Sequence, residues 1–350
     1  MKVGIVGFRG CGKTTVFNAL TGLHAEVGGF HGDDVKNLGN IKVPDKRLSA
    51  IAEKLNPKKL IFAEIIFADL AATTPKQGAG FSGEVLTEMR QSDALVHVVR
   101  AFDNPELAEE TDAFRDIQAF ESEICLADLM VVESRLTRLK KTGDKSKERE
   151  YLEKIQAHLE QEKPLRTLDF TEDVWNLFAG FTFLSLEDCL ILLNLPEDQA
   201  TDEPSGEIQA YAKEHGVRLM TISGEVEMEL NDLEEEERNE FLESLGLTEP
   251  AKDRFIRAAY EMLSLISFFT FGPDEVRAWT IKKGITAQKA AGKIHSDIER
   301  GFIRAEVWEW EDVVSHDGSE AKLKEAKKLS LEGKGYIPKD GQCIHFRFNV

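Results

Sequence analysis

The stretch Gly7-Phe8-Arg9-Gly10-Cys11-Gly12-Lys13-Thr14 decides the fold of this chain. It satisfies the pattern GxxxxGK[ST], in which glycines let the backbone wrap around phosphate groups. The apolar run Lys2–Val6 precedes it and predicts a strand, and Thr14–Leu20 follows it with helical spacing. Strand, loop and helix in this order predict a phosphate-binding loop, because its backbone N–H groups and the helix N-terminus bind negative charge. A plain glycine-rich turn is the alternative.

Two side chains of this loop carry specific chemistry. Lys13 is expected to reach the β- and γ-phosphates of a nucleotide, and Thr14 to offer its hydroxyl to Mg²⁺. A magnesium site also needs an acid, and Asp69 ends the apolar stretch Leu60–Asp69. We therefore predict Thr14 and Asp69 as the metal-binding residues and assign no catalytic residue. The nucleotide contacts predicted from the loop are Phe8, Arg9, Gly10, Cys11, Gly12, Lys13, Thr14 and Thr15.

The base of the nucleotide is expected to be recognised at the end of a later strand. Asn194-Leu195-Pro196-Glu197 follows an apolar run and is similar to the Asn-Lys-x-Asp signature of GTP-binding proteins, changed at two positions. Because an Asn amide can pair with N6 and N7 of adenine, this segment favours ATP over GTP. A loop Asn that only caps a helix is the alternative. The contacts predicted here are Asn194, Glu197, Ser223 and Gly224.

Strand and helix patterns alternate through the first 262 residues, with one interruption. Apolar strands are predicted at Leu60–Asp69, Ala94–Arg100, Asp188–Asn194 and Val217–Ile222, and the helical segments between them imply a mainly parallel sheet. Between 117 and 159, apolar residues recur at helical spacing on both sides of Thr142-Gly143-Asp144. This pattern predicts an antiparallel helical hairpin, either a solvated structural arm or a partner-binding arm.

The pattern changes again after Phe268. Strands are predicted at Val276–Ile281 and Phe302–Val307, and a short helix at Thr286–Ile294. Cys343–Val350 alternates apolar and polar residues, as a half-buried strand does. The predicted domains are a nucleotide-binding domain at 1–118 and 181–262, a helical hairpin at 119–180, and an α+β domain at 265–350.

Composition limits the function classes. The chain has 44 basic and 63 acidic residues, a net charge of −19, which disfavours non-specific adhesion to nucleic acid or anionic membrane. We expect no DNA sequence specificity. The charge is uneven, because the first 250 residues carry 27 basic against 48 acidic residues and the last hundred carry 17 against 15. The C-terminal end can therefore present a locally basic face.

Other features point to a cytoplasmic protein. The sequence contains no run of about 18 apolar residues, so it predicts no membrane span. No signal-peptide pattern precedes the first strand. The four cysteines (Cys11, Cys125, Cys189 and Cys343) are far apart, which fits a reducing compartment and argues against disulfides or structural zinc. His97 lies within an apolar strand and is expected to be a satisfied core histidine.

Seven segments spread over nearly the whole chain match a known pattern: Val43–Leu48, Asn194–Glu197, Phe268–Thr270, Glu275–Thr280, Ala290–Asp297, Gly301–Glu306 and Asp340–Phe348. In these segments the chain resembles the YchF or Obg-like ATPase family, a branch of the P-loop NTPases related to translation factors. The resemblance implies a P-loop α/β domain with a parallel sheet, an inserted coiled-coil hairpin, and a C-terminal TGS domain, which is a β-grasp module associated with RNA. It also implies a cytoplasmic, ribosome-linked NTPase that favours ATP.

The nucleotide end departs from the family at three places. The family has Pro-Asn where this chain has Arg9-Gly10, and a threonine for magnesium in the stretch occupied here by Gly32-Asp33-Asp34. The family's Asp-x-x-Gly is replaced by Asp69-Leu70-Ala71-Ala72, followed by Thr73-Thr74-Pro75. Each departure changes a position that is expected to lie near the γ-phosphate, and so affects the expected hydrolysis. We expect slow ATP hydrolysis in a conformational switch; the alternative is a nucleotide-binding module that does not hydrolyse and acts through partners. A small-metabolite kinase would need a basic lid, which these domains do not supply.

Two groups of cations in the last hundred residues suggest a partner. They are Arg277, Lys282, Lys283, Lys289 and Lys293, and then Lys322, Lys324, Lys327 and Lys328. A solvated face that balances nearby acids is one interpretation. The TGS resemblance implies the other, that this face contacts structured RNA or a ribosomal surface.

Overall fold

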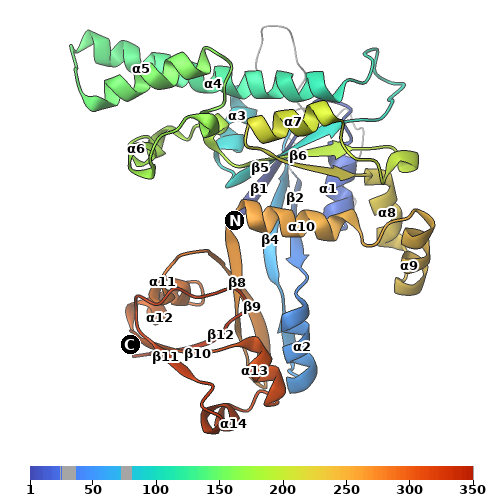
Figure 1. Cartoon of the computed structure of the whole chain (residues 1–350), viewed down its shortest axis with the longest axis vertical. Helices are drawn as coiled ribbons and strands as arrows, with labels where there is room; N and C mark the ends of the chain where they lie inside the picture. The colour runs from blue at the N-terminus through green and yellow to red at the C-terminus, as the bar shows by residue number, and fades with distance from the viewer. Residues whose placement is uncertain (24, 26–36, 72–80, 350) are drawn as a thin grey trace. The chain divides into compact units, whose positions relative to one another are not determined.

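The computed structural model describes residues 1–23, 25, 37–71 and 81–349, and the chain divides into two units (Figure 1). The first unit comprises Met1–Asn40 and Ile66–Phe255. The second comprises Ile41–Ile65 and Ile256–Val350. Among the described residues, no helix combines the length and the apolar character needed to cross a bilayer.

A six-stranded sheet organises the first unit. Its order is β2 (Asn37–Val43), β4 (Ala63–Asp69), β1 (Lys2–Val6), β5 (Ala94–Arg100), β6 (Cys189–Asn194) and β7 (Arg218–Ile222). The pairs β1–β4, β1–β5, β5–β6 and β6–β7 are all parallel, which confirms the predicted α/β fold. Every residue of β5 and β6 is buried, as expected for central strands that are covered on both faces.

Helices cover both faces of this sheet. On one face, α3, α4 and α7 share a hydrophobic cluster to which they contribute Met89, Phe120 and Ile208. On the other face, the ring of Phe67 in β4 lies 5.4 Å from that of Phe255 in α10. The described helices of this unit are α1 (Lys13–Thr21), α3 (Gly83–Arg90), α4 (Ala113–Lys141), α5 (Lys147–Leu159), α6 (Glu172–Asn176), α7 (Gly206–Glu214), α8 (Gly224–Asp232), α9 (Glu235–Ser244) and α10 (Ala251–Met262). The last of them, α10, continues into the second unit.

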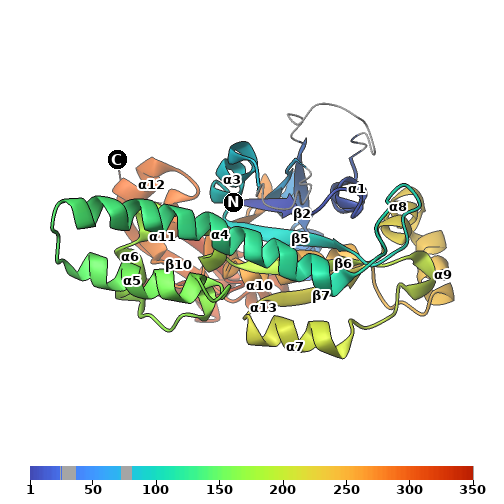
Figure 2. The ribbon, with the colours of Figure 1, turned by 90° about the horizontal axis from the view of Figure 1, so that it is seen from above.

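The predicted helical hairpin is formed by α4 and α5, which extend side by side away from the sheet (Figure 2). Its own core packs Val132, Leu136 and Leu139 of α4 against Leu152 and Ile155 of α5. The first helix begins at 113 rather than at 119, because Asp112 caps it by accepting a hydrogen bond from the backbone N–H of Arg115. Its first half packs on the sheet, so α4 belongs both to the nucleotide domain and to the hairpin.

A second six-stranded sheet organises the other unit. Its order is β11 (Ser330–Glu332), β10 (Phe302–Trp308), β12 (Cys343–Phe348), β8 (Leu265–Thr270), β9 (Glu275–Lys282) and β3 (Lys59–Ile61). The pairs β8–β9 and β10–β12 are antiparallel, while β12–β8 and β3–β9 are parallel. Four helices in this unit follow β8 along the chain: α11 (Ala287–Gly292), α12 (Ser296–Arg300), α13 (Trp310–Ser315) and α14 (Glu320–Glu325).

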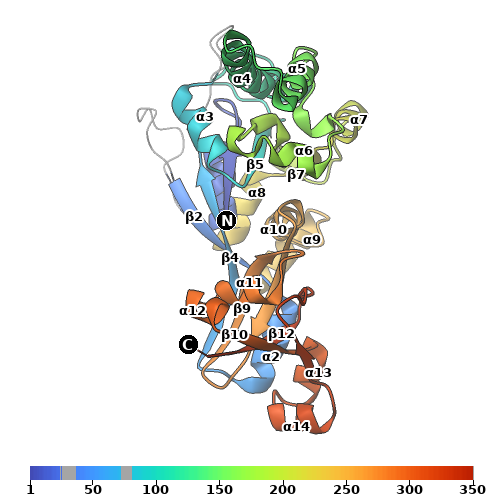
Figure 3. The ribbon, with the colours of Figure 1, turned by 90° about the vertical axis from the view of Figure 1, so that its left-hand side faces the viewer.

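Residues 41–65 pack with the C-terminal unit, which corrects the predicted assignment of all of 1–118 to the nucleotide-binding domain. In this segment α2 (Lys46–Leu55) lies beside the strands of the second sheet (Figure 3). It buries Leu48 and Ile51 in a cluster with Phe269. Arg47 of α2 donates from Nη1 to the Asp340 carboxylate at 2.8 Å, and Asp340 in turn accepts from the backbone of β8. The segment is therefore part of the second unit's core.

The predicted strand Leu60–Asp69 is two strands in two sheets. β3 ends at Ile61 and pairs with β9, whereas β4 begins at Ala63 and pairs with β1 beyond Ile66. A continuous apolar run predicts burial but does not specify which sheet provides the neighbours, so the break was not visible in the sequence.

Candidate functional site

The phosphate loop joins β1 to α1 at the carboxyl edge of the first sheet, where ligands bind in open α/β folds. Gly10 and Gly12 have left-handed φ values of 77° and 81°. A Cβ atom at Gly12 would lie 2.3 Å from the Asn194 amide nitrogen, and one at Gly10 would lie 2.7 Å from a methyl carbon of Leu107. Both positions therefore require glycine for conformation and for space.

Lys13, Thr14 and Asp69 form a buried polar cluster at the start of α1. Lys13 is 7% exposed and Asp69 is 4% exposed. The Lys13 ammonium donates to the Asp69 carboxylate and to the backbone oxygen of Leu70. The Thr14 hydroxyl donates to the other carboxylate oxygen of Asp69 at 3.1 Å. The structure thus brings together the three residues predicted to bind phosphate and metal.

This cluster fits a magnesium ion. Thr14 and Asp69 supply a hydroxyl and a carboxylate next to each other, and Mg²⁺ prefers such oxygen ligands while keeping several waters and phosphate oxygens. In the described part of the chain, no group of three or more His, Cys, Asp or Glu could hold a metal by itself. The metal site is therefore one that a bound phosphate would complete.

Asn194 connects two loops of the site through both ends of its side-chain amide. Its nitrogen donates to the backbone oxygen of Cys11 at 3.1 Å, and its oxygen accepts from the backbone N–H of Gly224 at 2.9 Å. The residue is 4% exposed. Each bond uses only one amide hydrogen or one lone pair, so the second N–H and the second lone pair remain for a base. The two bonds also give Asn194 a positioning role, because they hold the phosphate loop beside Gly224.

The other residues predicted at the base end lie on both sides of Asn194. Ser223 is buried at the start of α8, and its hydroxyl has no hydrogen-bond partner among the described residues. Leu195 is also buried, and its N–H donates to the backbone oxygen of Ile222 at 2.8 Å. Glu197 is exposed after Pro196, so its carboxylate can accept a hydrogen bond from a ligand.

The remaining loop residues differ in exposure. Phe8 and Cys11 are buried, and burial raises the pKa of the Cys11 thiol to about 11, so it stays neutral. Arg9 is exposed, and Thr15 is half-buried on α1. The segments Gly32-Asp33-Asp34 and Ala72 to Pro75, in which the chain departs from the expected pattern, lie outside the described residues.

Three contacts at this site were not predicted from the sequence. Asn37 donates to Asp69 at 3.4 Å, and Asn104 donates to the backbone oxygen of Gly10 at 3.4 Å. Leu107 packs over Gly10. A signal for Asn104 was available, because Asn104-Pro105 follows β5, whose carboxyl end lies beside that of β1. No comparable signal marks Asn37.

His97 is a core residue, but it is not fully satisfied. It is 1% exposed, and its ring stacks on Phe120 with centroids 4.0 Å apart. Its Nε2 has no hydrogen-bond partner among the described residues. Burial lowers the pKa of His97 to about 3, so the imidazole is neutral near pH 7.

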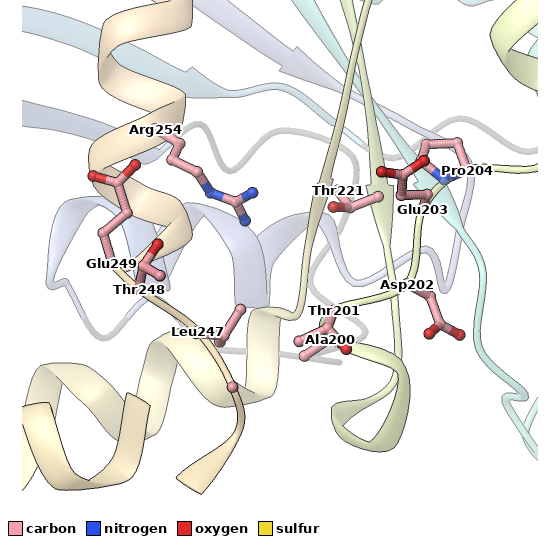
Figure 4. Close-up of a pocket in the computed structure, with 11 residues that line it drawn as sticks. Ala200, Thr201, Asp202, Glu203, Pro204, Thr221, Leu247, Thr248, Glu249 and Arg254 are labelled. Carbon is pink, nitrogen blue, oxygen red and sulfur yellow. The ribbon is translucent and has the colours of Figure 1, made fainter. Parts of the chain in front are cut away.

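A separate hollow of about 280 Å³ lies on the first unit (Figure 4). It is lined by residues 200–204, by Thr221 of β7, by residues 246–249 and by Arg254 of α10. No residue predicted to contact the nucleotide lines it. Its wall carries charges of both signs, so it indicates no particular ligand.

Two family models match the chain. Residues 2–135 match the family described as "50S ribosome-binding GTPase". Residues 265–349 match the C-terminal domain family of YchF GTPases, which is described only as a protein of unknown function (DUF933).

Full-length relatives agree with these matches. The chain is 40% identical to "Ribosome-binding ATPase YchF" of Bacillus subtilis over all of both chains. It is 38% identical to the protein of the same name from Escherichia coli O157:H7, over 100% of this chain and 99% of that one. The solved structure titled "Structure of the Schizosaccharomyces pombe YchF GTPase" superposes with a TM-score of 0.87 and 28% identity, covering 99% of this chain and 97% of the other.

Proposed function

The chain belongs to the YchF family, and from that premise we propose that it binds ATP with Mg²⁺, hydrolyses it slowly, and uses the bound state as a switch in ribosome association. The curated relatives carry the name ribosome-binding ATPase, and we extend ATP binding and the ribosome to this chain. A cytoplasmic setting goes with this proposal. The observation that carries it is the buried cluster of Lys13, Thr14 and Asp69.

In the proposed complex, the triphosphate competes with Asp69 for Lys13. Phosphate oxygens carry more negative charge than a single carboxylate, and the loop N–H groups and the N-terminus of α1 add to the attraction. Asp69 would then be shared between Thr14 and the metal. A bound Mg²⁺ supplies charge neutralisation at the β- and γ-phosphates. The protein's own contribution is to keep Thr14 and Asp69 together in a buried site.

The preference for ATP is proposed to depend on the absence of lysine at Leu195 and on the Glu197 carboxylate. An exposed carboxylate can accept a hydrogen bond from the amino group at adenine N6. Asn194 contributes indirectly, because it fixes the phosphate loop relative to Gly224. Competition between ATP and GTP for the site tests this proposal. A tenfold preference for GTP would show instead that Glu197 recognises guanine.

Slow hydrolysis is the part of the proposal that is hardest to distinguish from the alternative, a nucleotide-binding module that does not hydrolyse. A module that binds nucleotide without hydrolysing it would use the same cluster. Single-turnover hydrolysis of ATP by excess protein, measured beside ATP binding, separates the two. Binding without any phosphate release above the rate of an Asp69→Asn variant would favour the non-hydrolysing module.

Ribosome association is proposed to involve the first of the two basic groups in the C-terminal unit. Lys282, Lys283, Lys289 and Lys293 are exposed and form no ion pair in the described residues. The second group is largely neutralised within the chain, because Lys322 pairs with Asp317 at 2.9 Å and Lys328 with Asp312 at 3.0 Å. The second group therefore has less unpaired positive charge with which to bind a partner.

The test is co-sedimentation with ribosomes at low and moderate salt, with and without ATP. Reversing Lys282 and Lys283 to Glu should weaken association by about tenfold, since the contacts would be to phosphates and electrostatic. Reversing the exposed Lys54 and Lys213 to Glu removes the same charge elsewhere and serves as the matched control. Equal sedimentation of both variants would rule out this face.

A further inference from the structure

The tip of the helical hairpin, residues 135–149, concentrates positive charge in a strongly acidic chain. It carries seven basic residues against the two acids Asp144 and Glu148, a net charge of +5, whereas the whole chain has −19. The seven are Arg135, Arg138, Lys140, Lys141, Lys145, Lys147 and Arg149. We call this segment the hairpin tip; it comprises the last turns of α4, the connecting loop and the start of α5.

Most of this charge has no ion-pair partner among the described residues. Arg135 forms two hydrogen bonds to Glu148, at 2.7 and 2.9 Å, and Arg149 donates to Glu153 at 2.9 Å. The other five side chains are exposed and form no ion pair in the part of the chain that the structure describes: Arg138, Lys140, Lys141, Lys145 and Lys147.

Helix stability accounts for only part of this arrangement. Cations in the last turn of α4, such as Lys140 and Lys141, are favourable because they face the negative end of the helix dipole. Lys147 is the first residue of α5, and Lys145 precedes it. A cation is unfavourable there, because the N-terminal end of a helix is the positive end of its dipole. These two lysines also increase the repulsion within the tip.

The acidic surface around the sheet of the first unit does not cancel this field through solvent. Ala127 is the last residue of α4 that packs in the cluster on the sheet. Lys141 follows fourteen positions later, which places it about 21 Å further along the helix. The screening length at physiological ionic strength is about 8 Å. The hairpin extends from the sheet as an arm (Figures 1 and 2). Its tip is therefore a positive patch beyond the electrostatic reach of the sheet region.

We propose that the hairpin tip binds the phosphate backbone of structured RNA. The proposal rests on ribosome association for its setting, and it adds a contact separate from the lysines of the C-terminal unit. Lysine ammonium groups suit phosphates as compact point charges. The tip contains no aromatic residue that could stack on an unpaired base. Recognition should therefore follow the shape and charge of a duplex and not its sequence.

The experiment compares two triple variants of the full-length protein. Lys141→Gln/Lys145→Gln/Lys147→Gln removes three charges from the tip, and Gln is a good helix former, so the hairpin should remain folded. Lys54→Gln/Lys163→Gln/Lys213→Gln removes three exposed lysines elsewhere and is the matched control. Thermal unfolding checks that both variants fold. The probes are an RNA duplex of about 20 base pairs, longer than the ~16 that a double-stranded RNA module spans, and purified ribosomes.

The tip variant should bind the duplex about tenfold more weakly at low salt than the wild type or the control. Its plot of log affinity against log salt should be shallower by about two to three, the number of phosphate contacts removed. Equal affinities and equal slopes for the tip and control variants would overturn the proposal.

The two probes separate this proposal from ribosome association. If the wild type binds the duplex through the tip but does not sediment with ribosomes, the proposed function fails and the RNA-binding tip stands. If ribosome binding is intact in the tip variant and the duplex is not bound by any form, the tip proposal fails alone. If the tip instead drives self-association that disappears in the tip variant, its partner is the acidic surface of a second copy, and the RNA proposal is wrong.

Discussion

The phosphate loop and the hairpin tip place their cations in opposite environments. Lys13 is buried and already donates to Asp69 and to a backbone oxygen. At the tip, five cations are exposed and form no ion pair in the described residues. A buried charge is strong because little water screens it, and it needs a partner inside the chain to be tolerated. An exposed charge needs no partner inside the chain, but its attraction for a ligand is screened by water and weakens as the salt concentration rises. The first arrangement suits a defined small ligand, and the second an extended partner.

Lys13→Ala should have the largest effect, because it breaks a buried ion pair. Removing one member leaves the Asp69 carboxylate buried and unpaired, which costs about 3–5 kcal/mol of stability. ATP affinity should fall by roughly 2 kcal/mol or more, about thirtyfold. Urea unfolding and calorimetric titration measure the two effects. Lys13→Ala/Asp69→Asn should recover stability but not binding. Equal ATP affinity for Lys13→Ala and the wild type would contradict the phosphate role of Lys13.

Asn194→Ala tests whether a buried neutral group positions the loop. It leaves the Cys11 carbonyl and the Gly224 N–H without their partner, at about 1–3 kcal/mol each. Because these two bonds fix the loop for either nucleotide, affinities for ATP and GTP should fall together. Competition titrations with both nucleotides give the readout. Loss of adenine preference with unchanged overall affinity would mean that Asn194 reads the base.

His97 extends the comparison to a buried basic group that has no acidic partner in the described part of the chain and therefore stays neutral. Its folded pKa of about 3 lies below the ordinary value of 6.5, so the unfolded chain binds more protons between these values. Stability should therefore fall as the pH decreases below 6.5, by about 2 kcal/mol at pH 5 from this group alone.

His97→Phe retains an aromatic ring against Phe120 but removes the titrating group. The loss of stability between about pH 7.5 and pH 5, measured by urea unfolding, should be smaller in this variant than in the wild type by about 2 kcal/mol. An identical pH dependence in both proteins would show that His97 is not kept neutral by the fold.

Glu148→Gln should have the smallest effect and the opposite sign. It releases Arg135 from its exposed ion pair and raises the net charge of the tip by one. Exposed pairs contribute little to stability, so the melting temperature should hardly change. Affinity for duplex RNA should rise by about twofold at low salt, with a steeper salt dependence. Glu240→Gln, which neutralises an exposed acid on α9, is the control. A decrease in affinity would contradict a phosphate-binding tip.

Elements with local signals could be predicted from the order of the residues alone. A glycine pattern between a strand and a helix specified the phosphate loop, because positive φ and close approach to a ligand require glycine there. Helical periodicity on both sides of Thr142-Gly143-Asp144 specified the hairpin, and alternation from Cys343 specified the last strand. The Asp ending β4 was recognisable because parallel strands bring their carboxyl ends to one edge.

Which elements share a core, and which polar groups share a partner, became clear only in the folded chain. The apolar residues 60–69 divide between two sheets, and α2 packs beside strands that follow it by more than two hundred positions. The Asn194 amide has the donors and acceptors to pair with a base, but in the fold both ends are bonded to backbone. Periodicity indicates that a side chain is buried, and residue type indicates which hydrogen bonds it can form. Neither records which distant segment provides the neighbour, because that depends on packing between residues far apart in the chain.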